Sequence, residues 1–252
     1  MRISPRPWLG LAAFVGYIAV ILGVQGTSGI PYPELADTAH NIWRSGVLSI
    51  VLASLLMAVL ATWWGWWRPA LFERPPTTRR WTIIAPVLMA LLASTNLLLT
   101  DWGGVGWGFV LAGIALGLAV GFGEEFTARG LLLVGLRGRL REVMVWVLTC
   151  SMFGLMHGIN IILGAPAGDT VVQIISAAMS GSVFYILRRV TGTLIWAMAL
   201  HGLWDFSLFV LAASGSSNAF TILQLPFGLL AVIFGFFATK DAPSGLTVQG
   251  GR

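Results

Sequence analysis

Eight apolar stretches separated by short polar segments make up almost the whole chain. A helix needs roughly 17–25 apolar residues to cross the hydrocarbon core of a bilayer, and each stretch reaches about that length. The breaks between them carry Pro, Gly, Ser and Asp, as turns do. The pattern therefore predicts an all-α, polytopic membrane bundle, with residues 1–252 as a single domain. The predicted spans are residues 8–24, 42–64, 81–100, 106–136, 143–163, 170–190, 193–213 and 219–238.

Composition supports this class of protein and argues against others. Hydrophobic residues make up 57% of the chain and charged residues only 10%, whereas soluble domains carry about a quarter charged residues. The net charge is +5, but the basic residues lie in short loops, where membrane topology explains them better than nucleic-acid binding would. The single cysteine, Cys150, excludes an intrachain disulfide and a cysteine-based metal cluster.

The distribution of positive charge predicts the orientation. If the N-terminus is cytoplasmic, an even number of spans places both termini there, and basic residues gather on that side, as the positive-inside rule requires. The opposite side receives Arg44 together with Glu34, Asp37, Asp101 and Asp169. The predicted cytoplasmic side receives Arg2, Arg6, Arg68, Arg74, Arg79, Arg80, Arg137, Arg139, Arg141, Arg188, Arg189, Lys240 and Arg252.

A few ionisable residues lie inside the predicted spans, where facing lipid would cost several kcal/mol each. Glu125 and Arg129 are four residues apart and share one helix face, whereas Glu124 is rotated by about 100° from Glu125. These side chains should therefore face the interior of the bundle or a water-filled cavity. The intramembrane ionisable residues are Glu124, Glu125, Arg129, His157, His201 and Asp205.

Three of these residues lie at comparable depth on three different helices. At a rise of about 1.5 Å per residue, Glu124, His157 and His201 come out roughly 18, 21 and 13 Å from the predicted inner boundary. Such a layer contains the parts for water activation, a carboxylate base with histidine partners. Each residue also has a purely structural interpretation: Glu125–Arg129 as an ion pair, a histidine as an interhelical tie, and Asn160 as a packing residue.

Three motifs occur in order within the spans: Glu124-Glu125-x-x-x-Arg129, Phe153-x-x-x-His157 and His201-x-x-x-Asp205. This pattern resembles the signature of the CPBP family, which comprises type II CAAX prenyl endopeptidases and bacteriocin-processing proteins, also named the Abi family. The resemblance covers about residues 106–213 at the level of motifs and the whole chain at the level of architecture. Phe153 itself is interpreted as packing.

The resemblance implies roles for the motif residues. Glu124 would activate the attacking water with His157 as its partner, and Glu125 and Arg129 would organise the first motif. His201 and Asp205 would stabilise the oxyanion of a tetrahedral intermediate. Because an ionised Asp cannot donate a hydrogen bond, we expect Asp205 to orient His201 instead.

No cofactor is expected, although zinc is an alternative. The family has been described both as metalloproteases and as glutamic proteases, and Glu124, His157 and His201 could ligate zinc with an open position for water. The histidines come from separate helices and the chain has no H-E-x-x-H motif. General-base catalysis without a metal is therefore the favoured interpretation.

The leading functional hypothesis is an intramembrane endopeptidase. Its partners would be the lipid bilayer and a peptide or protein substrate in or at the membrane, and its location a prokaryotic plasma membrane with the site reached from the cytoplasmic side. One alternative is a proton-coupled transporter, because intramembrane Glu, His and Asp also build proton relays; no internal repeat supports it. Another is a non-catalytic scaffold or immunity protein of the same fold.

Overall fold

The computed structural model describes residues 1–73 and 77–242. Within these residues, eight helical segments are long and apolar enough to cross a membrane, and each coincides with a predicted span to within a few residues. The predicted polytopic helical bundle is confirmed. The segments are Pro7–Gly26, Ala39–Trp64, Arg80–Leu99, Trp107–Arg137, Glu142–Ile162, Ala167–Thr191, Ile195–Ala213 and Ala219–Thr239.

Several segments combine more than one type of helix. The second consists of α2 (Ala39–Asn41), a π-helical segment η2 (Ile42–Val47) and α3 (Leu48–Trp64), and the fourth of α6 (Trp107–Glu125), a π-helical segment η4 (Phe126–Leu132) and α7 (Leu133–Arg137). The first span is α1 (Pro7–Gly26), and the sixth and seventh are α10 (Ala167–Thr191) and α11 (Ile195–Ala213). The remaining spans contain η3 (Arg80–Ile83) with α5 (Ile84–Leu99), α8 (Glu142–Met156) with α9 (Ile159–Ile162), and η5 (Ala219–Leu223) with α12 (Gln224–Thr239).

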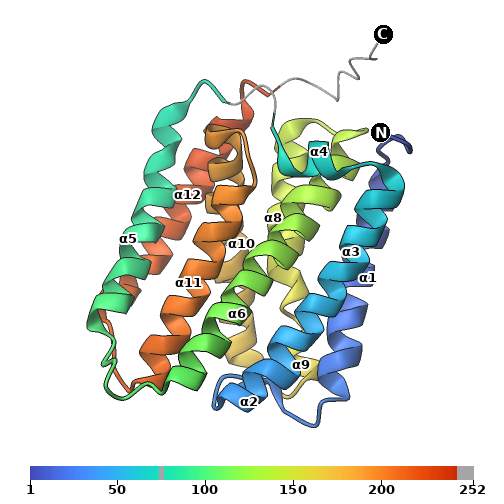
Figure 1. Cartoon of the computed structure of the whole chain (residues 1–252). Helices are drawn as coiled ribbons and strands as arrows, with labels where there is room; N and C mark the ends of the chain where they lie inside the picture. The colour runs from blue at the N-terminus through green and yellow to red at the C-terminus, as the bar shows by residue number, and fades with distance from the viewer. Residues whose placement is uncertain (74–76, 243–252) are drawn as a thin grey trace.

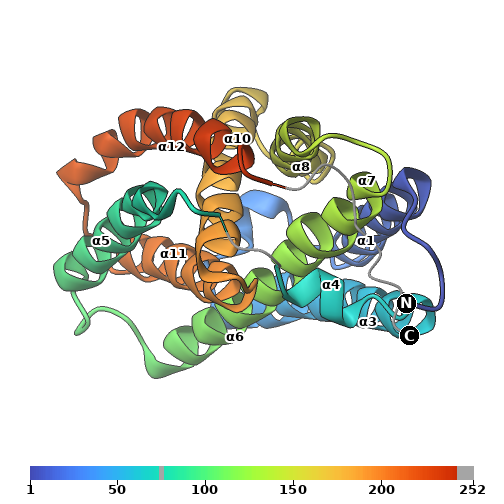
Figure 2. The ribbon, with the colours of Figure 1, turned by 90° about the horizontal axis from the view of Figure 1, so that it is seen from above.

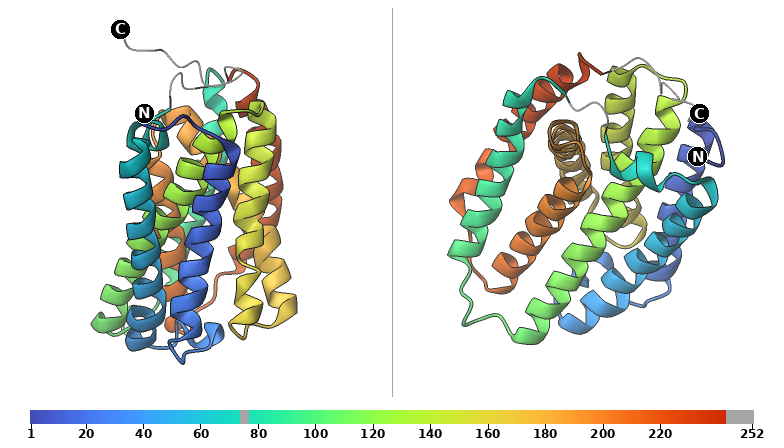
Figure 3. Two further views of the ribbon diagram at one scale, coloured as in Figure 1. Left: turned by 90° about the vertical axis from the view of Figure 1, so that its right-hand side faces the viewer. Right: turned by 45° about the horizontal axis from the view of Figure 1, so that its top comes forward.

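Two hydrophobic clusters hold the helices together. One joins α5, α8, α10, α11 and α12, and the other joins α1, α3 and α6. The view from above shows α10 inside the ring of helices, between α8 and α12 on one side and α11 on the other (Figure 2). Because α6 packs along α11, it connects the two clusters (Figure 3).

Glycines let α6 and α11 approach each other closely. A Cβ atom on Gly117 of α6 would lie 2.7 Å from the carbonyl oxygen of Gly202 in α11, and a Cβ on Gly202 would clash equally with Gly117. Small residues at helix contacts are typical of membrane bundles, where van der Waals packing drives association. This contact fixes the two helices that carry the charged motifs.

The chain begins at the end of the bundle where α3 and α12 finish (Figure 1). The basic residues predicted to share one side lie at this end wherever the structure describes them; Arg74 and Arg252 fall outside the described residues. That this end faces the cytoplasm stays a prediction. We refer to it as the arginine end, and to the other as the η1 end, after the short segment η1 (Tyr32–Glu34) that lies there.

Several arginines at the arginine end are not simple loop charges. Arg188 and Arg189 are fully buried, and both bind Glu73, at 2.9 and 2.6 Å. Arg137 binds the same carboxylate at 2.8 Å and also pairs with Glu142. Glu73 follows the short helix α4 (Trp67–Leu71), so this network fastens the α3–α5 connection onto α10.

Candidate active site

The two glutamates occupy the last turn of α6, just before the helix widens into η4. The 2.8 Å ion pair between Arg129 Nη1 and Glu125 Oε1 is completely buried. A π-helical turn is rare, and it is frequently found at functional sites. The predicted pairing of Glu125 with Arg129 is confirmed.

Glu125 also holds His201, which its spacing in the sequence did not indicate. His201 Nδ1 lies 3.0 Å from Glu125 Oε1, the same oxygen that accepts from Arg129. Because a carboxylate accepts hydrogen bonds, Nδ1 carries the hydrogen and Nε2 is left to face the other carboxylates. Glu125 therefore ties η4 to α11 and sets the orientation of the imidazole.

His201 Nε2 faces two further carboxylates at longer distance. It lies 4.0 Å from Glu124 Oε2 and 3.9 Å from Asp205 Oδ2. Both separations are longer than a direct hydrogen bond. We had expected Asp205 to orient His201, but the imidazole instead hydrogen-bonds to Glu125. A gap of this size can be bridged by a water molecule that hydrogen-bonds both groups.

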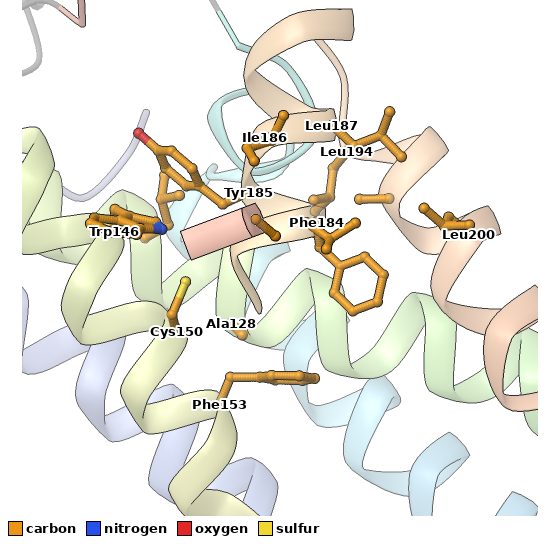
Figure 4. Packing of buried hydrophobic residues seen from close by; sticks show 14 of the residues in the cluster. Ala128, Trp146, Cys150, Phe153, Phe184, Tyr185, Ile186, Leu187, Leu194 and Leu200 are labelled. Atoms are coloured by element: carbon orange, nitrogen blue, oxygen red, sulfur yellow. The ribbon is translucent and has the colours of Figure 1, made fainter. Parts of the chain in front are cut away.

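Aromatic rings enclose the imidazole. Phe184 of α10 stacks on His201 with ring centroids 4.6 Å apart, and Phe153 of α8 meets it edge-on at 5.6 Å. The Arg129 guanidinium lies 3.9 Å from the centre of the Phe153 ring, a cation–π contact. Figure 4 shows the two phenylalanines projecting from α8 and α10 within the larger hydrophobic cluster. Phe153 thus packs, as predicted, but against the charged groups of the site.

His157 lies at the end of α8 and has a different partner from the one expected. Its Nδ1 lies 3.0 Å from the backbone oxygen of Phe153, to which it donates. The ring is thereby oriented through its own helix, and Nε2 is available to a ligand. The imidazole that lies 4.0 Å from Glu124 is that of His201.

Asn160 forms part of a chain of polar side chains. Its amide donates to Gln173 Oε1 at 2.8 Å, and the Gln173 amide donates to the Tyr32 hydroxyl at 3.0 Å. This chain links α9, α10 and η1. Asn160 therefore links helices through hydrogen bonds, which agrees with its interpretation as a structural residue.

Two residues of the site had no signal in the sequence. The hydroxyls of Tyr17 in α1 and Ser54 in α3 are buried without a hydrogen-bond partner, and both lie where a Cβ on Gly123 would be. Gly123 immediately precedes the two glutamates, so these hydroxyls lie next to the layer that contains Glu124. An isolated Tyr and Ser in apolar spans resemble ordinary packing residues, which is why they were missed.

A cavity of about 550 Å³ collects the predicted residues. Glu124 and the two histidines line it together with Asp205 and Asn160. Glu125 and Arg129 are not among the lining residues and are completely buried. The volume is typical of ligand pockets. The layer of Glu124, His157 and His201 predicted from spacing and depth therefore lines one cavity. The buried pair of Glu125 and Arg129 lies outside the lining and binds His201 through Glu125.

The zinc alternative concerns Glu124, His157 and His201. Among residues 1–73 and 77–242, no three His, Cys, Asp or Glu side chains are grouped as a metal ion would require. Nδ1 of His201 is held by Glu125 and Nδ1 of His157 by a backbone oxygen, which leaves Nε2 of both rings free, as in histidines that bind zinc. Metal-free catalysis stays a prediction.

Comparison with known families agrees with the motifs. Residues 106–207 match the family model described as type II CAAX prenyl endopeptidase Rce1-like. Over this range the chain is similar to the Rce1-like family. The matched range begins at the start of α6 and ends in α11, so it contains all three motifs of the Rce1-like core. At the level of the family, the match supports an intramembrane protease that acts on a peptide or protein at the membrane. Neither a curated protein nor a solved structure matches the chain.

Proposed function

We propose that the Rce1-like core is an endopeptidase that hydrolyses a peptide bond with a water molecule activated by Glu124. The observation that carries the proposal is the contrast between the two glutamates. Oε2 of each glutamate is buried without a hydrogen-bond partner. Glu125 is completely buried outside the lining, with Oε1 bound to Arg129 and His201, whereas Glu124 lines the cavity. A general base needs an unoccupied oxygen facing the substrate.

The reaction then follows from the positions of the groups. Water between Glu124 and His201 Nε2 transfers a proton to Glu124 as its oxygen attacks the scissile carbonyl. The C–N bond of the tetrahedral intermediate breaks as Glu124 passes that proton to the leaving amine. The His201 ring, which faces three carboxylates, would donate Nε2–H to the oxyanion as an imidazolium, because its Nδ1–H is already used by Glu125. Neutral His157, whose Nδ1–H is used by the Phe153 carbonyl, would accept a hydrogen bond from the attacking water at Nε2. Asp205, next to His201 Nε2, lies at the entrance to this layer.

The test uses the purified full chain in liposomes with a library of quenched fluorescent peptides. Glu124→Gln keeps the size of the side chain and removes the base, so cleavage should fall by about 10²–10⁴-fold. Asp101→Asn, which neutralises an exposed acid between α5 and α6 and outside the cavity lining, is the control and should cleave normally. A Glu124→Gln variant that cuts at the wild-type rate would refute the assignment.

Two further measurements separate the alternatives. Stoichiometric zinc in active protein, measured by inductively coupled plasma analysis, would replace the metal-free mechanism with one that uses the metal. If no peptide is cut but the liposomes take up solute in response to a pH gradient, the protein is a proton-coupled transporter. Peptide binding with neither activity would identify a scaffold.

A further inference from the structure

The cavity extends from the catalytic layer in one direction only. On α10 its lining runs from Asp169 to Phe184 and includes none of the final turns, and on α1 it begins at Ile18 and ends at Gln25. Both stretches lead from the layer of Glu124 towards the η1 end. Within the described part of the chain, the exposed lining residues are Pro33, Asp169 and Val172. The mouth therefore lies where η1 meets the start of α10.

The arginine end of the same site is closed. Phe126 and Leu194 are completely buried, and Phe126 stacks with Phe122 and packs on Trp67 at centroid distances of 5.2 and 4.9 Å. Above them the chain after α4 is fastened across the α10–α11 turn, because Leu194 N–H donates to the Leu71 carbonyl at 2.8 Å. The Glu73 network locks the same segment. Access from the arginine end, which was predicted from the sequence, therefore has no corresponding opening in this structure.

The lining of the cavity is acidic. Glu124, Asp205 and Asp169 follow one another from the catalytic layer to the mouth, and among the described lining residues there is no Lys or Arg. Asp205 Oδ2 lies 3.9 Å from His201 Nε2. Burial raises the pKa of the Tyr32 hydroxyl near the mouth; the hydrogen bond with Gln173 opposes this shift, and the charges of Asp205 and Glu124 add to it. An acidic segment would be repelled along this route and a basic one attracted.

We propose that the substrate is a peptide segment carrying Lys or Arg, which enters from the side of the membrane opposite the arginine end through the mouth between η1 and α10. The proposal deepens the proposed function, on which it rests for the scissile bond. By the positive-inside rule that side is non-cytoplasmic. The substrate segment is cationic because carboxylates line the route, whereas the described lining contains no Lys or Arg side chain that could bind an anion.

The route is tested by thiol labelling in a Cys150→Ser background, which leaves the chain without other cysteines. Ser176→Cys lines the cavity, and Arg139→Cys lies exposed at the arginine end. A membrane-impermeant maleimide is applied to sealed vesicles of each orientation. The two positions should label from opposite sides, each at least about tenfold faster from its own side. Labelling of both from the same side would overturn the route.

The charge preference is tested by binding, which does not require cleavage. Fluorescent peptides that differ only in Lys or Glu beside the central bond are titrated into the Glu124→Gln variant. We expect the Lys peptide to bind roughly tenfold more tightly, and Asp169→Asn to reduce the ratio, whereas Asp37→Asn, an exposed acid outside the lining, should not. Equal binding of both peptides would overturn the proposal. Selective binding with no cleavage by wild type would refute only the proposed function.

Discussion

Replacing Glu73 by Gln should destabilise the protein more than any exposed substitution, because three arginines, two of them fully buried, share this carboxylate. Its oxygens lie 2.8 Å from Arg137, 2.9 Å from Arg188 and 2.6 Å from Arg189, and its side chain is 4% exposed. Burial would raise the pKa of Glu73, but the neighbouring guanidiniums hold it well below the usual range. The carboxylate is therefore ionised at neutral pH, and the variant leaves one positive charge uncompensated.

Removing one partner of a buried ion pair costs about 3–5 kcal/mol. At about 2–4 °C per kcal/mol for a chain of this size, the unfolding midpoint should fall by about 10 °C. The 12 tryptophans report unfolding in detergent through their fluorescence, and Glu34→Gln is the exposed control. Adding Arg188→Met to Glu73→Gln should recover part of the loss, with a coupling energy of at least about 1 kcal/mol. A midpoint within about 2 °C of the control would refute the interpretation that this network carries stability.

Three further predictions concern the site and its support. Glu125→Leu should lower cleavage about 10–100-fold and also the unfolding midpoint, because the ring of His201 loses its orienting partner and a buried arginine its counter-charge; unchanged cleavage would contradict this. Gly202→Val should reduce the yield of folded protein on size-exclusion chromatography, since the backbone of Gly117 occupies the space of the new side chain, whereas Gly23→Val, which meets nothing within 4 Å, should not. Burial opposes ionisation of Asp241, but hydrogen bonds from threonines hold its pKa at about 2, below an unfolded value of about 3.9. Its contribution to stability is thus complete above about pH 5 and is lost as the pH falls towards 2, so Asp241→Asn should flatten the decline of the unfolding midpoint over that range.

The spans and the catalytic layer could be predicted because both depend on local properties of the sequence. Hydrophobic length alone determines which segments cross a bilayer, and spacing placed Glu125 and Arg129 on one face. The depths of Glu124, His157 and His201 followed from counting residues along straight helices. For the same reason, the lining of the cavity contains the residues expected of it.

Features that depend on how helices rotate against one another could not be predicted. The hydrogen bond between His201 and Glu125 requires a particular rotation of α11 against α6. Gly117 and Gly202 permit the close approach of these helices, but their presence in the sequence does not predict the rotation. From the sequence, Arg188 was interpreted as a loop charge that sets the membrane topology. Its actual partner, Glu73, lies more than a hundred residues earlier, and such a distant ion pair leaves no local pattern in the sequence. The direction of the cavity likewise depends on which helix ends diverge.

The π-helical segment η4 has a consequence for how the chain tolerates changes in length. Each π turn contains one residue more than an α turn, because its hydrogen bonds run from i to i+5. If this segment closed into a regular α-helix with all its residues kept, everything after it would rotate by about 100° relative to Glu124. Arg137 would then turn away from Glu73. Deleting one residue between Phe126 and Leu132 would instead let the segment close into an α-helix with Arg137 near its present direction, because the loss of one residue offsets the tighter turn. The extra residue of η4 is therefore the position at which this helix should best tolerate a deletion.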